Sequence, residues 1–134
     1  MFVLDASFAI DHLEGVSSLK FYLEERSDRT FVMSAPTLLE TCIGRLYYRG
    51  SDRTPTEILE LFSWIEIHSP TERTAAHSMG IVDEIGSEAL KLTVEDAIVL
   101  GTGRELDAPI VSADSDHTHE AVKQAQPVEE YRDG

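Results

Sequence analysis

The chain begins with the sequence MFVLDASF (residues 1–8), in which a short apolar run ends at the acidic Asp5. Residues 1–5 are predicted to form a buried strand, because the run is short and almost wholly apolar. Ser7 then stands where it can cap a first helix, and Gly15 is a stop signal for that helix. A strand that leads at once into a helix is typical of α/β domains.

Strand-like and helix-like segments alternate along the rest of the sequence. Further strands are predicted at residues 31–33, 64–67 and 110–111, with a last edge strand from Val128. Helices are predicted at residues 17–26, 36–48 (with Gly50 as stop signal), 54–61 and 97–106, and from Pro70, where Ala75, Met79, Val82 and Ile85 recur at helical spacing. This alternation predicts an α/β domain with a parallel sheet. No repeat or linker interrupts it, so residues 1–134 are expected to form one domain.

The composition is that of an ordinary globular protein. With 134 residues, 42% of them hydrophobic, the chain is long enough for one core. The N-terminus lacks the basic segment of a signal peptide, and no apolar stretch approaches the roughly 20 residues that span a bilayer. Cys42, the only cysteine, excludes an intrachain disulfide and is expected to pack on a helix. These features predict a cytoplasmic protein with no membrane partner.

The charge is strongly acidic. Aspartate and glutamate total 25 against 11 lysines and arginines, a formal net charge of −14, and only three residues are lysines. Phosphate affinity normally comes from basic side chains. The balance therefore indicates either a partner other than nucleic acid or an environment in which salt screens the repulsion. We favour the second interpretation, because an acidic, lysine-poor surface is typical of proteins from salt-accumulating microorganisms such as haloarchaea.

Several acidic residues stand at the ends of predicted strands or near the starts of the helices that follow. They are Asp5, Glu40, Asp96, Asp114 and Asp116. In an open α/β sheet these positions meet at one rim, where ligands bind. Two carboxylates about 5 Å apart repel by roughly 3 kcal/mol at an effective dielectric near 20. A cluster of them is thus suited to a hard divalent cation, which allows all of them to stay ionised.

Each acid also has a simpler local role open to it. Asp5 could begin a turn or cap the next helix, and Asp96 could belong to a capping arrangement with Thr93. Glu40 could be a solvated helix residue, and the acids after the strand at 110–111 could be turn residues. We favour the metal-site interpretation. If every acid had only its local role, their common position at one rim would be a coincidence.

Four short motifs resemble, in order, those of PIN-domain ribonucleases. They are Leu4-Asp5-Ala6-Ser7, SAPTLLE (residues 34–40), Glu95-Asp96-Ala97-Ile98 and VSADSD (residues 111–116). The resemblance covers nearly the whole chain and is greatest to the toxins of VapBC-type toxin–antitoxin pairs. It implies a PIN-like three-layer α/β/α domain with a central parallel β-sheet. The activity it implies is that of a metal-dependent endoribonuclease.

The resemblance also implies roles for particular residues. The implied catalytic and metal-binding residues are Asp5, Glu40, Asp96 and Asp114. Asp116 corresponds to a further metal-binding acid of lower rank. Ser7 and Ser112 match hydroxyl positions that orient carboxylates or water, with helix capping or turn formation as the alternative. The implied cofactor is Mg²⁺ or Mn²⁺, which keeps bound waters that can attack a phosphodiester.

Two histidines next to these acids offer a different ligand set. His117 and His119 follow Asp114 and Asp116 and could complete a transition-metal cluster. We instead expect His117 to replace an aromatic residue often found at this position of the family, and His119 to begin a final helix. Carboxylate-rich sites favour Mg²⁺ or Mn²⁺ over Zn²⁺.

Three other features have ordinary explanations. The sequence Gly101-Thr102-Gly103 falls within a predicted helix, so we expect it to permit close packing and not to bind phosphate. Arg45 and Arg49 could contact RNA, but pairing with surface acids is the more common fate. A phospho-acceptor receiver domain would need an acidic pair at the end of its first strand, and Asp5 has no acidic neighbour.

The resemblance implies partners as well as a substrate. We expect RNA as substrate, a cognate antitoxin whose tail covers the acidic rim, and a homodimer or a toxin–antitoxin hetero-oligomer. An apolar helical face of the tail would dock between helices. The candidate groove residues are Phe8, Leu13, Leu19, Tyr22 and residues 46–48, for which core packing is the alternative. The alternatives for function are an RNA-processing nuclease outside a toxin–antitoxin pair and a non-catalytic PIN-fold interaction module.

Overall fold

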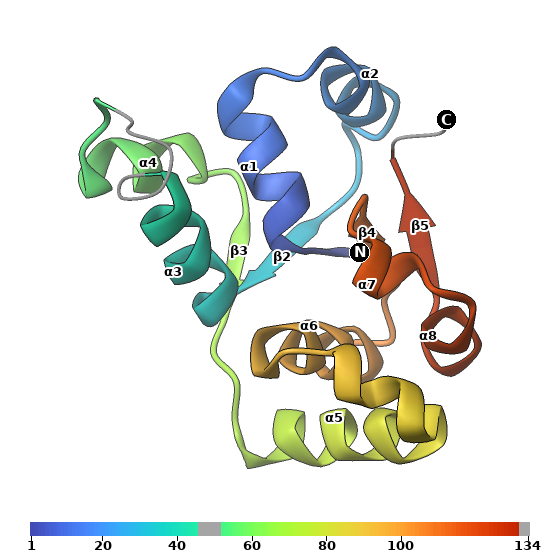
Figure 1. Cartoon of the computed structure of the whole chain (residues 1–134). Coiled ribbons are helices and arrows are strands. Elements are labelled where there is room, and N and C mark those ends of the chain that lie inside the picture. Colours follow the sequence, from blue (N-terminus) through green and yellow to red (C-terminus); the bar gives the residue numbers. More distant parts are fainter. Residues whose placement is uncertain (46–51, 132–134) are drawn as a thin grey trace.

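A computed structural model describes residues 1–45 and 52–131 of the chain. Its strands are β1 (Phe2–Leu4), β2 (Phe31–Ser34), β3 (Glu66–His68), β4 (Ile110–Ser112) and β5 (Val128–Glu130). They form one sheet in the order β3-β2-β1-β4-β5, in which every neighbouring pair is parallel. Helices flank this sheet, as Figure 1 shows. The prediction of an α/β/α domain with a central parallel sheet is confirmed.

The helices alternate with the strands along the chain. They are α1 (Ala6–Glu14), α2 (Ser17–Glu25), α3 (Ala35–Ile43), α4 (Pro55–Leu61), α5 (Glu72–Ile85), the 3-10 helix η2 (Gly86–Lys91), α6 (Val94–Glu105), α7 (Ser115–Thr118) and α8 (Glu120–Ala125). Within the described ranges, no helix is both long and apolar enough to cross a membrane. The end of the helix predicted to reach Tyr48, together with Arg49 and Gly50, lies outside the described residues.

Local sequence sets most helix ends. Gly15 ends α1 in the left-handed backbone region, with φ at 69°, where a residue without a Cβ is unstrained. Thr54 opens α4 with a capping box. The prediction that Ser7 caps α1 is wrong, because Asp5 is the cap and its side chain accepts a hydrogen bond from the Phe8 amide.

Three other predicted starts are displaced by a few residues, among them that of α6, which begins at Val94, after the capping residue Thr93, and not at residue 97. β3 begins at Glu66 and not at Trp64, because the chain is still in turns there and the Trp64 indole donates to the Leu61 carbonyl at 2.9 Å. α5 begins at Glu72, after the capping residue Thr71, and not at Pro70.

The two faces of the sheet carry separate apolar cores. Successive strand residues point to opposite faces, so Leu4 joins one core and Val3 joins the other. The core of Leu4 includes residues of α1 and α2, namely Phe8, Leu13, Leu19 and Tyr22, all at most 7% exposed, and Cys42 packs against it. The core of Val3 includes residues of α5, α6 and α8, namely Ile81, Val99, Leu100 and Val122. Phe8, Leu13 and Tyr22 are therefore core residues and not groove residues.

Helix α6 approaches α5 closely because it carries glycine at the contact. A Cβ on Gly101 would overlap the Ser78 hydroxyl and would lie 2.8 Å from the Thr74 carbonyl oxygen. The Ser78 hydroxyl in turn donates to the Ala97 carbonyl at 2.7 Å. A Cβ on Gly103 would lie 2.5 Å from Ile110 of β4. The expectation that these glycines permit close packing agrees with this geometry.

The face of α5 that packs on α6 is not the one marked by apolar spacing. Ala75, Met79 and Val82 are exposed, Met79 by 67%. The buried residues are instead Thr74, Ser78 and Ile81. Small polar side chains fit the shallow gap opposite the α6 glycines. The sequence of α5 alone therefore does not predict which of its faces is buried.

Candidate metal centre

Strand register brings three polar residues together at the carboxyl rim of the sheet. Leu4 of β1 is in register with Met33 of β2 and with Val111 of β4. The residues that follow them are Asp5, Ser34 and Ser112, each at most 1% exposed. The centre of the rim is thus built from a carboxylate between two serines, as the position of Asp5 predicted.

The Asp5 carboxylate is held by hydrogen-bond donors on both oxygens. Its Oδ1 accepts from the Ser7 hydroxyl at 2.7 Å and from the Phe8 amide at 3.0 Å. Its Oδ2 accepts from the Ser112 hydroxyl and lies 2.9 Å from Nδ1 of His117. Ser7 also accepts from the Ala113 amide. The two serines therefore fix the orientation of the Asp5 carboxylate.

His117, on α7, lies between two of the predicted acids. Its side chain is 2% exposed, with Nδ1 near Asp5 and Nε2 3.3 Å from Oδ1 of Asp96. Burial lowers the pKa of the imidazole, but the hydrogen bond with Asp5 and the charges of Asp5, Asp96 and Asp114 raise it more. The net effect is a pKa above the ordinary histidine value. From the sequence, replacement of an aromatic residue was the favoured role of His117, with metal ligation as the alternative.

Asp96 reaches the site from the first turn of α6. Its Oδ2 accepts from the Thr93 amide at 3.0 Å, and its own amide donates to the Thr93 hydroxyl. The capping arrangement considered as its alternative role is thus present. Because the cap uses only Oδ2, Oδ1 remains directed at His117. One carboxylate fixes the helix start and faces the site at the same time.

Asp114 belongs to the same cluster, whereas Asp116 does not. One ligand atom from each of Asp5, Asp114 and His117 lies within 4.8 Å of the others. Asp114 caps α7 by accepting from the Asp116 amide at 2.9 Å. Asp116 itself lines a separate small hollow with His119 and residues of η2. His119 is the capping residue of α8, in line with the expectation that it begins a final helix.

Glu40, on α3, completes the acidic surroundings together with a residue that sequence reasoning missed. Burial raises the Glu40 pKa, and the charges of Glu95, Asp96, Asp5 and Asp114 raise it further. Glu40 and Glu95 also line one hollow of about 330 Å3. The position of Glu95 next to Asp96 in the sequence was the signal that could have identified it. Ser34 could have been identified because it ends β2 as Ser112 ends β4.

The donor set fits a divalent cation. Carboxylates at the end of β1, in α6 and at the β4–α7 junction surround one imidazole. Carboxylate oxygens suit Mg²⁺ or Mn²⁺. The imidazole nitrogen suits Mn²⁺ or a later transition metal. Burial and the charges of the neighbouring carboxylates both raise the pKa of Glu40, and a bound cation would offset the repulsion among these carboxylates. The residues at this rim can therefore hold a metal ion.

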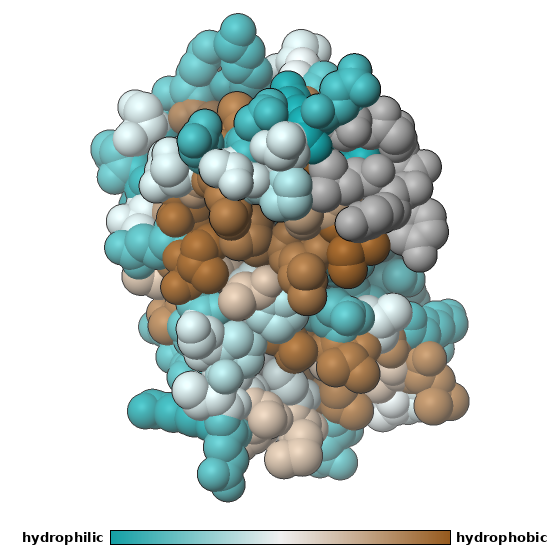
Figure 2. Space-filling model, turned by 90° about the vertical axis from the view of Figure 1, so that its left-hand side faces the viewer, coloured by the Kyte–Doolittle hydropathy of each residue, from teal (hydrophilic) through white to brown (hydrophobic). Residues whose placement is uncertain are grey.

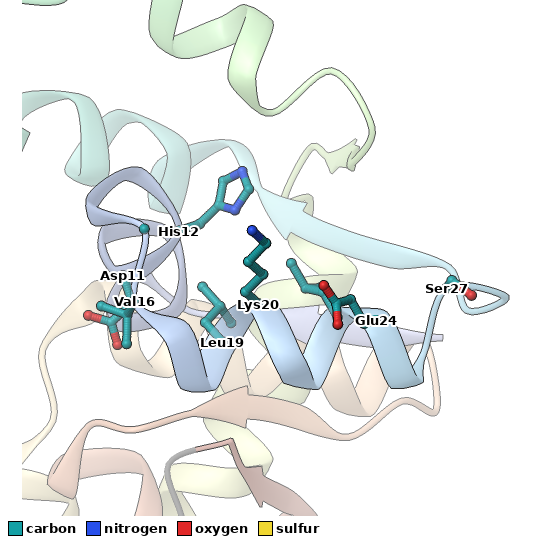
Figure 3. A pocket seen from close by; sticks show the side chains of 9 residues that line it. Asp11, His12, Val16, Leu19, Lys20, Glu24 and Ser27 are labelled. Carbon is teal, nitrogen blue, oxygen red and sulfur yellow. The ribbon is translucent and has the colours of Figure 1, made fainter.

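A further hollow, of about 480 Å3, lies between α1 and α2. Figure 3 shows His12 of α1 and Val16, Leu19 and Lys20, which stand at or in the first turn of α2, among the side chains that line this hollow. Of the described residues that were considered for a groove, Leu19 is the one that lines it. Arg45 lies elsewhere and pairs with Glu14 at 3.6 Å, the surface pairing that was expected.

Comparison with known proteins gives one family and several similar folds. A model of the PIN domain matches residues 2–123. A toxin–antitoxin complex from Klebsiella pneumoniae is similar at 20% identity and a TM-score of 0.70, over 96% of this chain and 100% of that chain. DNA-bound VapBC from Salmonella typhimurium is similar at 17% identity and 0.74, over 98% of both chains. VapBC2 from Rickettsia felis, bound to a DNA fragment from its promoter, is similar at 15% identity and a TM-score of 0.75, over 96% of this chain and 97% of that chain. No curated protein sequence matches the chain.

Proposed function

This chain belongs to the PIN-domain family, and from that premise we propose that it is a metal-dependent endoribonuclease that hydrolyses RNA phosphodiester bonds. One observation carries the proposal: Asp5, Asp114 and His117 place ligand atoms within 4.8 Å of one another at the rim of the sheet. The proposed catalytic residues are Asp5, Glu40, Asp96 and Asp114. Mg²⁺ or Mn²⁺ is the proposed cofactor, with Asp116 as a peripheral acid.

The residues of the chain would divide the work of hydrolysis. A bound divalent cation would supply an activated water and would offset charge on the phosphate. Ser7 and Ser112 hold Asp5 in a fixed orientation, so the ligand is pre-organised before the metal arrives. Glu40 has a raised pKa and therefore takes up a proton more readily than an ordinary glutamate. This property suits it to accept a proton from the attacking water.

Cleavage of single-stranded RNA by the purified protein tests the proposal. We expect activity with Mg²⁺ or Mn²⁺, none with EDTA, and none in Asp96→Asn with the metal present. Asp107→Asn is the matched control: it removes an exposed carboxylate at a backbone φ of 52°, which asparagine tolerates. Full cleavage by Asp96→Asn, or equal cleavage in EDTA, would refute the nuclease assignment.

We further propose that the chain is the toxin of a VapBC-type pair and that an antitoxin tail covers the acidic rim. The hollow beside Glu40 and Glu95 supports this, because its other walls are apolar and include Leu39 and Ile43 of α3. Figure 2 shows apolar side chains gathered on the side of the molecule where α3 lies. A tail with an apolar helical face and one arginine or lysine would match both parts of this surface.

Co-expression with the gene immediately upstream tests the toxin role. We expect the chain alone to arrest growth and the pair to restore it, with a small basic-tailed protein co-purifying in a hetero-oligomer. Leu39→Glu should weaken that complex, whereas Leu90→Glu, at a residue 90% exposed and outside the hollow, should not. Equal growth with and without the neighbour would refute the toxin role and leave the nuclease proposal standing.

A further inference from the structure

One ring nitrogen of His117 is buried without a hydrogen bond. Among the described residues, Nε2 has no hydrogen-bond partner, although the side chain is only 2% exposed and Nε2 makes an ion-pair contact at 3.3 Å with Oδ1 of Asp96. A buried polar atom without a hydrogen bond is destabilising. A buried atom of this kind, aimed into a cluster of carboxylates, indicates a ligand on that side of the ring.

The other ring nitrogen fixes how the ring is presented. Nδ1 lies 2.9 Å from Oδ2 of Asp5, and a proton on Nδ1 makes this a hydrogen bond donated to the carboxylate. The lone pair then lies on Nε2. A carboxylate that accepts the proton of one ring nitrogen is the usual support for a histidine whose other nitrogen binds a metal. Asp5 therefore has the geometry of a positioning residue for His117.

The separation between Nε2 of His117 and Oδ1 of Asp96 matches that of two ligands on one metal ion. Oδ1 of Asp96 lies 3.3 Å from Nε2. Two ligands that each lie about 2.1 Å from one ion, at an angle near tetrahedral, are about 3.4 Å apart. Asp96 is also the more accessible partner, with 13% of its side chain exposed against 2% for His117, so an ion can enter from the Asp96 side.

We propose that Nε2 of His117 and Oδ1 of Asp96 together bind the metal ion, and that the site consequently selects Mn²⁺ and similar transition-metal ions over Mg²⁺. This inference deepens the proposed nuclease function and rests on it for the location of the site. Mg²⁺ takes oxygen ligands, whereas imidazole suits transition metals. A carboxylate-only site would not make this distinction so sharply.

Pulsed electron paramagnetic resonance of the full chain loaded with Mn²⁺ tests the ligand directly. A coordinated imidazole couples its ¹⁴N nucleus to the Mn²⁺ electron spin, and incorporation of ¹⁵N-histidine replaces this signal with that of ¹⁵N. Calorimetric titration with Mn²⁺ and with Mg²⁺ measures the selectivity. Both readouts are independent of RNA cleavage.

Two matched variants separate ligation from positioning. His117→Asn keeps a side-chain amide near the position of Nδ1, where it can still donate to Asp5, and removes Nε2. His119→Asn changes the neighbouring histidine, half-exposed at the start of α8, to a residue that also caps helices well. We expect His117→Asn to lose the nitrogen coupling and at least about tenfold in Mn²⁺ affinity, with Mg²⁺ affinity within about twofold. His119→Asn should behave as the unchanged chain does.

The outcomes are distinguishable from failure of the nuclease proposal. Mn²⁺ binding without nitrogen coupling, or no Mn²⁺ binding at millimolar metal, would overturn the inference and would leave His117 as a buried counter-ion of Asp5 and Asp96. If His117→Asn does not fold, the ¹⁴N and ¹⁵N spectra of the unchanged chain still show whether an imidazole nitrogen binds the Mn²⁺ ion. Coupling that disappears in His119→Asn would also overturn it. Nitrogen coupling in a chain that cleaves no RNA would support the ligand and refute the nuclease.

Discussion

Asp5→Asn and Asp96→Asn should both abolish RNA cleavage but should differ in stability. Asp5 is 1% exposed and its carboxylate meets four hydrogen-bonding groups. Asparagine keeps one oxygen, which can face Ser7 and Phe8, and turns an NH₂ group toward the remaining two. Hydrogen bonds to a charged group are worth about 1.5–3 kcal/mol each. Partial rearrangement by the Ser112 hydroxyl leaves an expected net loss of about 2–4 kcal/mol.

Asp96→Asn should leave stability nearly unchanged. The asparagine oxygen can still accept from the Thr93 amide, so the cap of α6 survives. The lost attraction to His117 is offset by relief of the repulsion that raises the Glu40 pKa. We expect a change within about 1 kcal/mol.

Urea unfolding in EDTA measures both values without a metal contribution. A total stability of about 5–15 kcal/mol makes the Asp5→Asn loss plainly visible as a lower midpoint. If Asp5→Asn has the same urea midpoint as the unchanged chain, the four contacts of the Asp5 carboxylate are not formed in solution. A large loss in Asp96→Asn would show that its carboxylate does more than cap α6 and face His117.

Three other predictions concern glycine packing, the pKa of His117 and the net charge. Gly101→Ala should destabilise the protein by about 1–3 kcal/mol, because the added Cβ overlaps the Ser78 hydroxyl. Gly80→Ala should stabilise it by about 0.5–1 kcal/mol, because its Cβ lies 3.4 Å from the flexible Arg104 side chain and alanine favours the helix. Thermal melts that rank the two variants in the opposite order would contradict this prediction. Because the pKa of His117 is raised in the folded protein, its protonation stabilises the fold. This stabilisation is complete below about pH 6.5, the ordinary histidine pKa, and is lost as the pH rises through the pKa of His117 in the folded protein. Urea midpoints in EDTA should therefore fall between about pH 6 and 9, and midpoints that do not change with pH would contradict this contribution. Melting temperature should rise from about 0.1 M to molar KCl, more than with glucose at equal osmolality, because salt screens the net charge of −14; a flat or falling value would argue against salt adaptation.

The sheet and the outline of the site were predictable because they depend on local patterns. Apolar runs marked the strands, Gly15 and Thr54 marked helix ends, and Asp5 followed the run that became the central strand. Parallel strands then meet at one rim whatever their detailed packing. The positions of Asp96 and Asp114 at helix starts were equally readable from sequence.

What the sequence did not reveal depends on contacts between distant segments. The place of His117 between Asp5 and Asp96 requires α7, β1 and α6 to be packed first. The buried face of α5 was not readable from its own apolar residues, because α6 offers Gly101 and so accepts Ser78. Ser7 was expected to cap α1, but Asp5 precedes it and takes that role once its carboxylate is buried.

The rim is assembled from residues far apart in the sequence, and this affects when a site can exist during synthesis. Asp5 and Ser112 are 107 positions apart, and the Tyr131 hydroxyl bonds Asp11 across 120 positions. Contacts between residues so far apart in the chain carry a large loop-closure cost and slow folding. A ribosome makes about 5–20 residues per second, so a nascent chain spends several seconds with β1 and α1 exposed but with no β4 to complete the rim. The proposed metal site could therefore form only after the segment from Asp5 to His117 had emerged.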